Sequence, residues 1–140
     1  MTATVVYQGD LRTAATHLQS GTQILTDAPT DNHGKGEAFS PTDLVATALA
    51  SCMATIMGIA AKTHGIALEG TRFEVTKKMV SDPRRIGEIV VAVHYPENLS
   101  LSPKEKTILE KAAMGCPVLE SLHPDCKKTI SFHGGGNGVT

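Results

Sequence analysis

The sequence has few aromatic residues and no excess of charge of either sign. It contains no Trp, two Tyr and three Phe in 140 residues, so the core must be built mainly from Val, Ile, Leu, Met and Ala. Lys and Arg number 13 against 14 Asp and Glu, and no five like charges follow one another. Proteins that bind nucleic acid or anionic membranes through a basic surface lack this balance. The length is that of one domain, and we expect a single domain over 1–140.

Targeting and membrane-spanning signals are also missing. The segment Met1–Tyr7 has no basic stretch followed by an apolar run and small residues, which a secretory leader requires. No stretch reaches the roughly 20 apolar residues of a membrane span. We therefore expect a cytoplasmic protein.

The three cysteines, Cys52, Cys116 and Cys126, form no Cys-x-x-Cys motif. The first two are 64 positions apart (116 minus 52), unlike the clustered ligands of a zinc site, and the histidines are scattered. We expect no metal and no cofactor. In a reducing compartment, a disulfide between cysteines is usually transient and either catalytic or redox-sensing.

The order of the predicted elements is that of an α+β domain. Turn residues and alternating patterns predict an opening antiparallel meander, and two long strands follow the first helix. A polar loop occupies 27–39 and the glycine-rich tail, His133–Thr140, is predicted to be frayed. The predicted strands are 1–7, 11–18, 22–26, 71–80, 86–95 and 127–132, and the predicted helices are 41–64, 103–114 and 117–122.

The strongest local signal is the start of the first helix. Ser40 is a cap residue, Pro41 suits the first helical position, and Asp43 places a carboxylate near the positive helix end. From Leu44 to Lys62 the sequence is apolar nearly all round. We expect a core helix that is buried on most sides.

Each cysteine has a reactive and an ordinary interpretation. Cys52 lies mid-helix, where a cysteine is ordinarily a small buried hydrophobe. Cys116 precedes Pro117 at a predicted helix start, where free amides and the helix dipole can stabilise a thiolate; the alternative is a simple cap residue. Cys126, beside Lys127, is interpreted as structural or merely exposed.

Two motifs, each with a cysteine, resemble one known family. Phe39–Met53 (FSPTDLVATALASCM) resembles the central-helix motif of the OsmC/Ohr superfamily, the osmotically inducible and organic hydroperoxide resistance proteins. Ala112–Val118 (AAMGCPV) resembles the second cysteine motif of that family. The resemblance implies an OsmC-like fold, in which antiparallel sheets wrap around a long buried central helix. It also implies an intertwined homodimer with two active sites at the subunit interface.

The resemblance further implies a thiol-dependent peroxidase that reduces organic hydroperoxides. Cys52 would attack the peroxide, and Cys116 would condense with the resulting sulfenic acid to a disulfide. The implied partners are a small hydroperoxide and a dithiol or lipoylated-protein reductant, without nucleic acid or membrane. An alternative is a noncatalytic redox sensor or small-ligand-binding module that uses the same interface pocket.

The sequence departs from the better-studied members at the group that activates the thiol. Those peroxidases place a Glu directly after the Pro at the start of the central helix, where this chain has Thr42. Arg12 is the candidate for the catalytic arginine that this Glu would hold; the alternative is an exposed strand arginine. The departure indicates a less characterised OsmC-like branch, with weak peroxidase activity or a different substrate.

Overall fold

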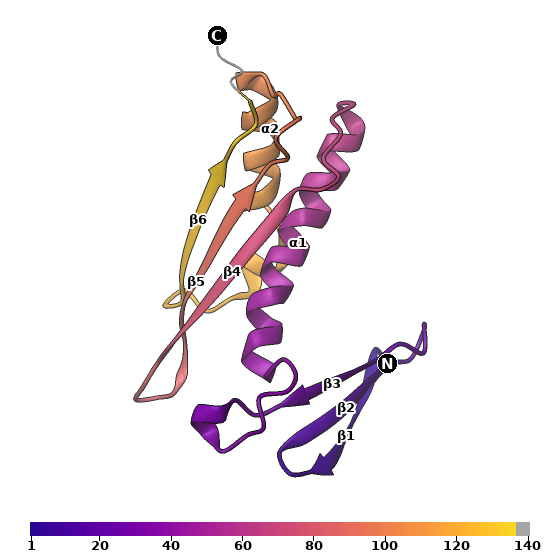
Figure 1. Cartoon of the computed structure of the whole chain (residues 1–140), viewed down its shortest axis with the longest axis vertical. Coiled ribbons are helices and arrows are strands. Elements are labelled where there is room, and N and C mark those ends of the chain that lie inside the picture. The colour runs from indigo at the N-terminus through magenta and orange to yellow at the C-terminus, as the bar shows by residue number, and fades with distance from the viewer. Residues whose placement is uncertain (137–140) are drawn as a thin grey trace. The chain divides into compact units, whose positions relative to one another are not determined.

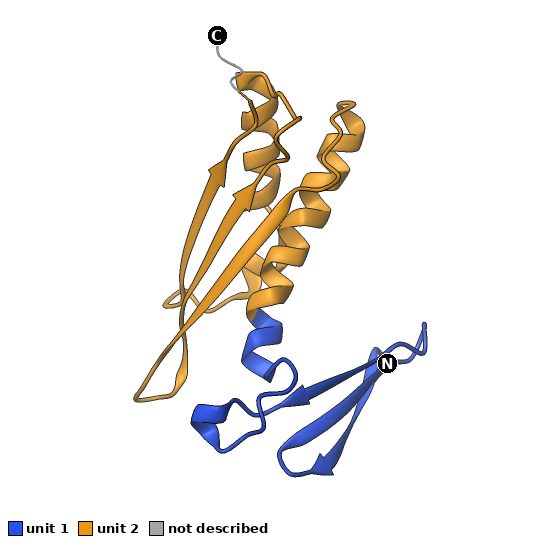
Figure 2. Ribbon diagram, viewed as in Figure 1, with its two compact units in different colours: residues 1–45 blue, residues 46–140 orange. Residues whose placement is uncertain are grey.

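The computed structural model describes residues 1–136 of the chain. It divides into two compact units, Met1–Val45 and Ala46–Thr140, which are described separately (Figure 2). The division falls within the first long helix, and the single domain over 1–140 stays a prediction. The predicted fraying is wrong for the start of the tail, because His133 belongs to a strand and the Gly135 carbonyl accepts a hydrogen bond from the Leu101 amide at 2.8 Å. Residues 137–140 lie outside the described residues.

The first unit is a three-stranded antiparallel meander (Figure 1). Its strands are β1 (Ala3–Gly9), β2 (Arg12–His17) and β3 (Gln23–Asp27), in the order β1-β2-β3, followed by a short 3-10 helix, η1 (Thr30–Asn32). Gly9 has a φ of +86°, which supplies the left-handed turn between β1 and β2. The predicted meander is therefore confirmed.

The second unit holds a mixed sheet of three strands and most of the helical structure. Helix α1 (Pro41–Thr63) enters it from the first unit, and β4 (Arg72–Val80) and β5 (Arg85–His94) pair antiparallel. Helices α2 (Pro103–Met114) and α3 (Pro117–Ser121) then lead to β6 (Lys127–His133). Strand β6 runs parallel to β5, so the prediction of antiparallel sheets is wrong at this pair. The helical crossover returns the chain to the end where β5 began, as a parallel pairing requires.

The core of the second unit lies between its sheet and its helices. Ile89, Val91 and Val93 alternate along β5 and are fully buried. They form one cluster with residues of α1 and with Leu109 of α2. Figure 1 shows α1 and α2 on the same side of this sheet. As expected from the scarcity of aromatics, aliphatic and methionine side chains fill most of this core.

Helix α1 buries one stripe rather than most of its surface, contrary to expectation. Val45 and Ile59 are 39% and 60% exposed. The helix ends within one residue of the predicted boundary; by its 23 residues and mean hydropathy of 2.0 it could cross a membrane, and 33% of its most apolar window is buried. The core helix of a protein outside the membrane meets the same criteria. The buried stripe consists of Ala46, Leu49, Ala50, Met53, Met57 and Ala61.

The predicted helix starts are confirmed by reciprocal capping. Ser40 Oγ accepts a hydrogen bond from the Asp43 amide at 3.0 Å, and Asp43 Oδ2 accepts one from the Ser40 amide at 3.0 Å. Ser102 and Glu105 form the same arrangement at the start of α2. These caps satisfy amides that the first turn of a helix leaves without partners.

Candidate functional site

Cys52 lies at the middle of α1, beside the stripe that faces the core. Its side chain is half-buried and packs against the core cluster together with Ile56, one turn further along the helix. The thiol is free. The helix therefore holds Cys52 rigidly at the margin of the core, where part of the side chain remains accessible.

Cys116 lies at the junction between α2 and α3 and is fully buried. It is the N-cap of α3: its Sγ accepts a hydrogen bond from the Leu119 amide at 3.3 Å. Pro117 follows at the first helical position, where its missing N–H is not needed and its fixed φ suits the helix. The sequence Gly115-Cys116-Pro117 thus ends one helix and starts the next with the sulfur at the turn.

The fold places the two thiols that the sequence singled out near enough for Cys52 to affect the pKa of Cys116. Burial is the main reason that the pKa of Cys116 is raised above its usual value. The Leu119 amide acts in the opposite direction, and the hydrogen bond and charge of Cys52 raise the pKa further. The alternative interpretation of Cys116 as a cap residue is confirmed. The amide at the helix start favours the thiolate as expected, but burial has the larger effect on the pKa.

Cys126 is buried, with 5% of its surface exposed, and belongs to the core cluster. Its Sγ lies 3.8 Å from the Lys127 carbonyl oxygen, to which it donates a weak hydrogen bond. Of its two interpretations, structural or merely exposed, the exposed one is wrong. Nothing in its surroundings resembles the proximity of Cys52 to Cys116.

Arg12, in the first unit, is not a solvated strand arginine. Its Nε and one terminal nitrogen donate to the two carboxylate oxygens of Asp27, each at 2.7 Å, and the same terminal nitrogen reaches Glu37 Oε1 at 3.1 Å. The Asp27 side chain has no exposed surface, whereas 25% of the Arg12 side chain is exposed. The hydrogen bond from Arg12 lowers the pKa of Asp27 against the opposing effect of burial and raises the pKa of Arg12.

Asp27 and Glu37 are the residues that the sequence reasoning missed. The family resemblance places the acid that holds the arginine at position 42, where this chain has Thr42. The Thr42 hydroxyl lies 3.3 Å from Ser40 Oγ, and Asp43 caps the helix. Arg12 and Asp27 are directly opposite in the β2–β3 register. Pairing the strands of the predicted meander residue by residue would therefore have identified Asp27 as the partner of Arg12. The Glu37 amide also donates to Asp27 Oδ2 at 3.1 Å, which ties the loop to this pair.

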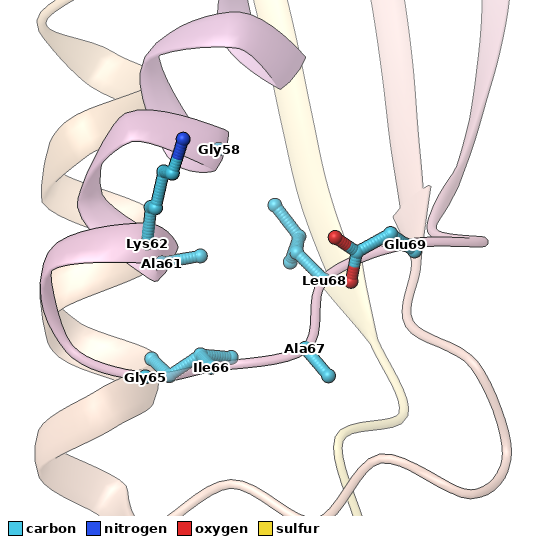
Figure 3. Close-up of a pocket in the computed structure, with 8 residues that line it drawn as sticks. All are labelled: Gly58, Ala61, Lys62, Gly65, Ile66, Ala67, Leu68 and Glu69. Carbon is cyan, nitrogen blue, oxygen red and sulfur yellow. The ribbon is translucent and has the colours of Figure 1, made fainter.

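A cavity of about 470 Å³ lies beside the C-terminal end of α1 and is lined by residues between 58 and 69 (Figure 3). Lys62 and Glu69 contribute opposite charges to its wall. Neither Cys52 nor Cys116 lines it. Within residues 1–136, no three His, Cys, Asp or Glu side chains gather in a way that could hold a metal ion. The remaining lining residues are Gly58, Ala61, Gly65, Ile66, Ala67 and Leu68.

Comparison with known proteins places this geometry in one family. Residues 34–131 match the family model described as OsmC-like protein. The search against curated proteins gave no match. The family match includes α1, α2 and both cysteines of the pair.

Solved structures agree with the family model. A protein from Psychrobacter arcticus 273-4, named for osmotic stress induction and a detoxification response, is 53% identical over 95% of this chain and 96% of its own, with a TM-score of 0.91. The fold is shared with an organic hydroperoxide resistance protein from Legionella pneumophila (17% identity, 94% and 96% coverage, TM-score 0.70). It is also shared with an OsmC-like protein from Mycoplasma pneumoniae (20% identity, 94% of both chains, TM-score 0.73). This chain therefore belongs to the OsmC-like protein family.

Proposed function

We propose that this protein is a thiol-dependent peroxidase that reduces organic hydroperoxides through Cys52 and Cys116. The observation that carries the proposal is that a half-buried free thiol, Cys52, lies near enough to a fully buried free thiol, Cys116, to affect its pKa. Burial raises the pKa of Cys116. In such a pair, one sulfur is reached by the substrate and the other attacks the sulfenic acid that forms on the first.

The reaction follows from the positions of the two sulfurs. Cys52, as thiolate, attacks the terminal oxygen of the hydroperoxide; the O–O bond breaks, an alcohol leaves after taking up a proton, and Cys52 becomes a sulfenic acid. The Cys116 sulfur then displaces the sulfenic oxygen as water and forms the disulfide. A dithiol or lipoylated-protein reductant supplies two electrons and two protons to restore both thiols.

Arg12 is proposed to assist the attack, as the family resemblance implies. In support, the bidentate pair with Asp27 fixes its guanidinium, and a quarter of the side chain stays exposed. In this chain Asp27 takes the part that a Glu at the position of Thr42 would take. Whether Arg12 acts on Cys52 stays a prediction, which Arg12→Lys tests: a charge without the planar fork lowers turnover if the guanidinium orients the peroxide.

The protein is proposed to act as a homodimer in the cytoplasm. In support of a dimer, β1 exposes Val5, Val6 and Tyr7 by 61–64%, an apolar surface that a lone chain rarely leaves in water. Light scattering would give twice the chain mass of 14.7 kDa. In support of the cytoplasm, a thiol pair that must be reduced after each turnover suits a reducing compartment.

The test of the proposed function is consumption of cumene hydroperoxide by the reduced protein with excess dithiol. Cys52→Ser is expected to reduce the rate to the uncatalysed background, because no sulfur remains to attack. Cys116→Ser is expected to slow turnover and to leave a sulfenic acid that a dimedone probe traps on Cys52. Cys126→Ser is the matched control: it removes a thiol outside the pair and should retain turnover in the folded protein.

A wild-type rate no higher than that of Cys52→Ser would refute the peroxidase. The noncatalytic redox sensor or small-ligand-binding module would then be the better function. A sensor would still form the disulfide once per oxidant without turning over, which mass spectrometry of the oxidised protein would show.

A further inference from the structure

We propose that the Cys52–Cys116 disulfide releases helix α3, because the sulfur that forms the disulfide is also the cap that holds the helix. This inference rests on the proposed function for its physiological oxidant. It explains how a reductant reaches a disulfide that includes a fully buried sulfur.

Helix α3 depends on its cap more than the other helices do. It has five residues, and none of them is fully buried. Isolated helices of this length are unstable in water, so packing and capping must hold α3 in place. Its packing consists of the partial burial of Val118 and Leu119, and of Leu122 directly after the helix, against the core. Its cap is the hydrogen bond from the Leu119 amide to Cys116 Sγ.

Oxidation must displace one of the two sulfurs. In the reduced protein both are free thiols that lie near enough to affect each other, and a disulfide requires them to close to bonding distance. Cys52 is carried by the 23-residue helix α1, whose buried stripe is anchored along the core. Cys116 is carried by the short turn between α2 and α3. We therefore infer that the Cys116 sulfur is the one that moves and that its movement breaks the hydrogen bond from the Leu119 amide.

The movement leaves the start of α3 without its acceptor. Loss of a helix cap makes the helix about five-fold less populated, or more where other contacts are few. Residues 117–122 directly follow Cys116, and the amide of Leu119 contacts its sulfur, so their release is expected to expose the disulfide on the Cys116 side. A dithiol can then attack a sulfur that is 0% exposed in the reduced protein.

The test is hydrogen exchange of the amides of residues 118–122 in the full-length reduced and oxidised proteins. Diamide oxidises the pair without a peroxide: Cys52 and Cys116 lose two protons and two electrons, which the diazene takes up as it becomes a hydrazine. Peptide mapping confirms the disulfide. We expect exchange of these amides at least about five-fold faster in the oxidised protein, from the loss of one cap. The amides of α2 should not change.

Two variants separate the cap from the redox step. Cys116→Ala has no acceptor and should show fast exchange in α3 even when fully reduced. Cys116→Ser restores an acceptor that caps well and should exchange like the reduced wild type. Cys52→Ser treated with diamide cannot form the pair and should also keep α3 protected. Circular dichroism verifies that each variant is folded.

Equal exchange in the reduced and verified disulfide forms would overturn the inference, as would normal protection of α3 in folded Cys116→Ala. If Cys116→Ala does not fold, the wild-type comparison and Cys116→Ser still decide the question. Failure of the proposed function is distinguishable from this result. If the proposed function fails, cumene hydroperoxide is not turned over, but diamide still forms the disulfide. Hydrogen exchange of the α3 amides in that disulfide form then tests the release of α3 by itself.

Discussion

The two units of the chain bury their chemically important groups by different means. The first unit is a small sheet with exposed apolar side chains such as Val5, and what it buries is an ion pair between Arg12 and Asp27. The second unit buries an aliphatic core, and at its margin two thiols lie near each other. In the first unit charges neutralise each other, so burial is tolerated. In the second unit burial raises the pKa of the Cys116 thiol, because no opposite charge is paired with it there.

The comparison predicts unequal sensitivity to loss of an aliphatic side chain. Leu49 of the second unit is fully buried, whereas Ile24 of the first unit is 47% exposed. Leu49→Ala should lower the free energy of unfolding by about 2–5 kcal/mol, because it removes contacts and leaves a cavity. Ile24→Ala should lower it by about 0.5 kcal/mol, as at other surface positions. Urea denaturation followed by circular dichroism measures both. A loss at Ile24 that approaches the loss at Leu49 would mean that a second chain covers the first sheet in solution, as in the proposed homodimer.

The helix caps give a second, smaller contrast. Ser40 is buried, with 2% exposure, whereas Ser102 is exposed. Ser40→Ala leaves the Asp43 amide without its acceptor in a place that water does not reach, and should lower the free energy of unfolding by about 2 kcal/mol. Ser102→Ala should lower it by about 1 kcal/mol, since water can replace the hydroxyl. The same unfolding experiment compares them, and a larger loss at Ser102 would contradict the burial argument.

The two tyrosines of the chain give a contrast of opposite sign. The Tyr95 hydroxyl is buried and has no hydrogen-bond partner within residues 1–136; burial and the charge of Glu110 raise its pKa to about 12. Tyr95→Phe should raise the free energy of unfolding by up to about 1 kcal/mol, because it removes an unsatisfied polar atom. Tyr7→Phe, at an exposed ring whose hydroxyl accepts from the Leu11 amide at 3.4 Å, should change it by less than about 0.5 kcal/mol in either direction. Thermal unfolding at neutral pH decides, and a loss of stability in Tyr95→Phe would mean that the hydroxyl has a partner in solution.

Local rules predicted most of the fold because the signals for it are local. The two Ser-Pro helix starts and the alternating strands are each visible within about ten residues, and both were confirmed. The direction of β6 could not be predicted in this way, since it depends on where α2 and α3 return the chain. The exposed face of α1 was missed because composition alone does not say which neighbours a helix has.

In the candidate site too, local sequence patterns predicted some features and missed those that depend on distant residues. Cys52 and Cys116 were identified by motif, and their proximity follows from packing that no local pattern encodes. The raised pKa of Cys116 was missed because a helix start and deep burial act in opposite directions, and only the structure shows that burial is the larger effect. The partner of Arg12 was sought at the family position and missed, although Asp27 lies opposite it in the β2–β3 register.

The last contrast is between two carboxylates that titrate in acid, one in each unit. No residue is substituted, so the stability at neutral pH is unchanged. The pKa of Asp27 is lowered by the hydrogen bond from Arg12, and the pKa of Glu74 by the hydrogen bond from Arg72. A lowered pKa in the folded state means that each carboxylate stabilises the fold above its unfolded pKa of about 4 and that this contribution is lost as the pH falls through the folded value.

Asp27 has no exposed side-chain surface, whereas 55% of Glu74 is exposed. Raising the salt to about 1 M shortens the screening length to about 3 Å, which weakens the Glu74 pair and leaves the enclosed Asp27 pair nearly intact. Carboxyl titration by NMR at low and high salt should therefore move the pKa of Glu74 back toward its ordinary value while that of Asp27 stays low. If Asp27 instead titrates at its ordinary value, the ion pair of the first unit is open in solution, and Arg12 is free to pair with another anion.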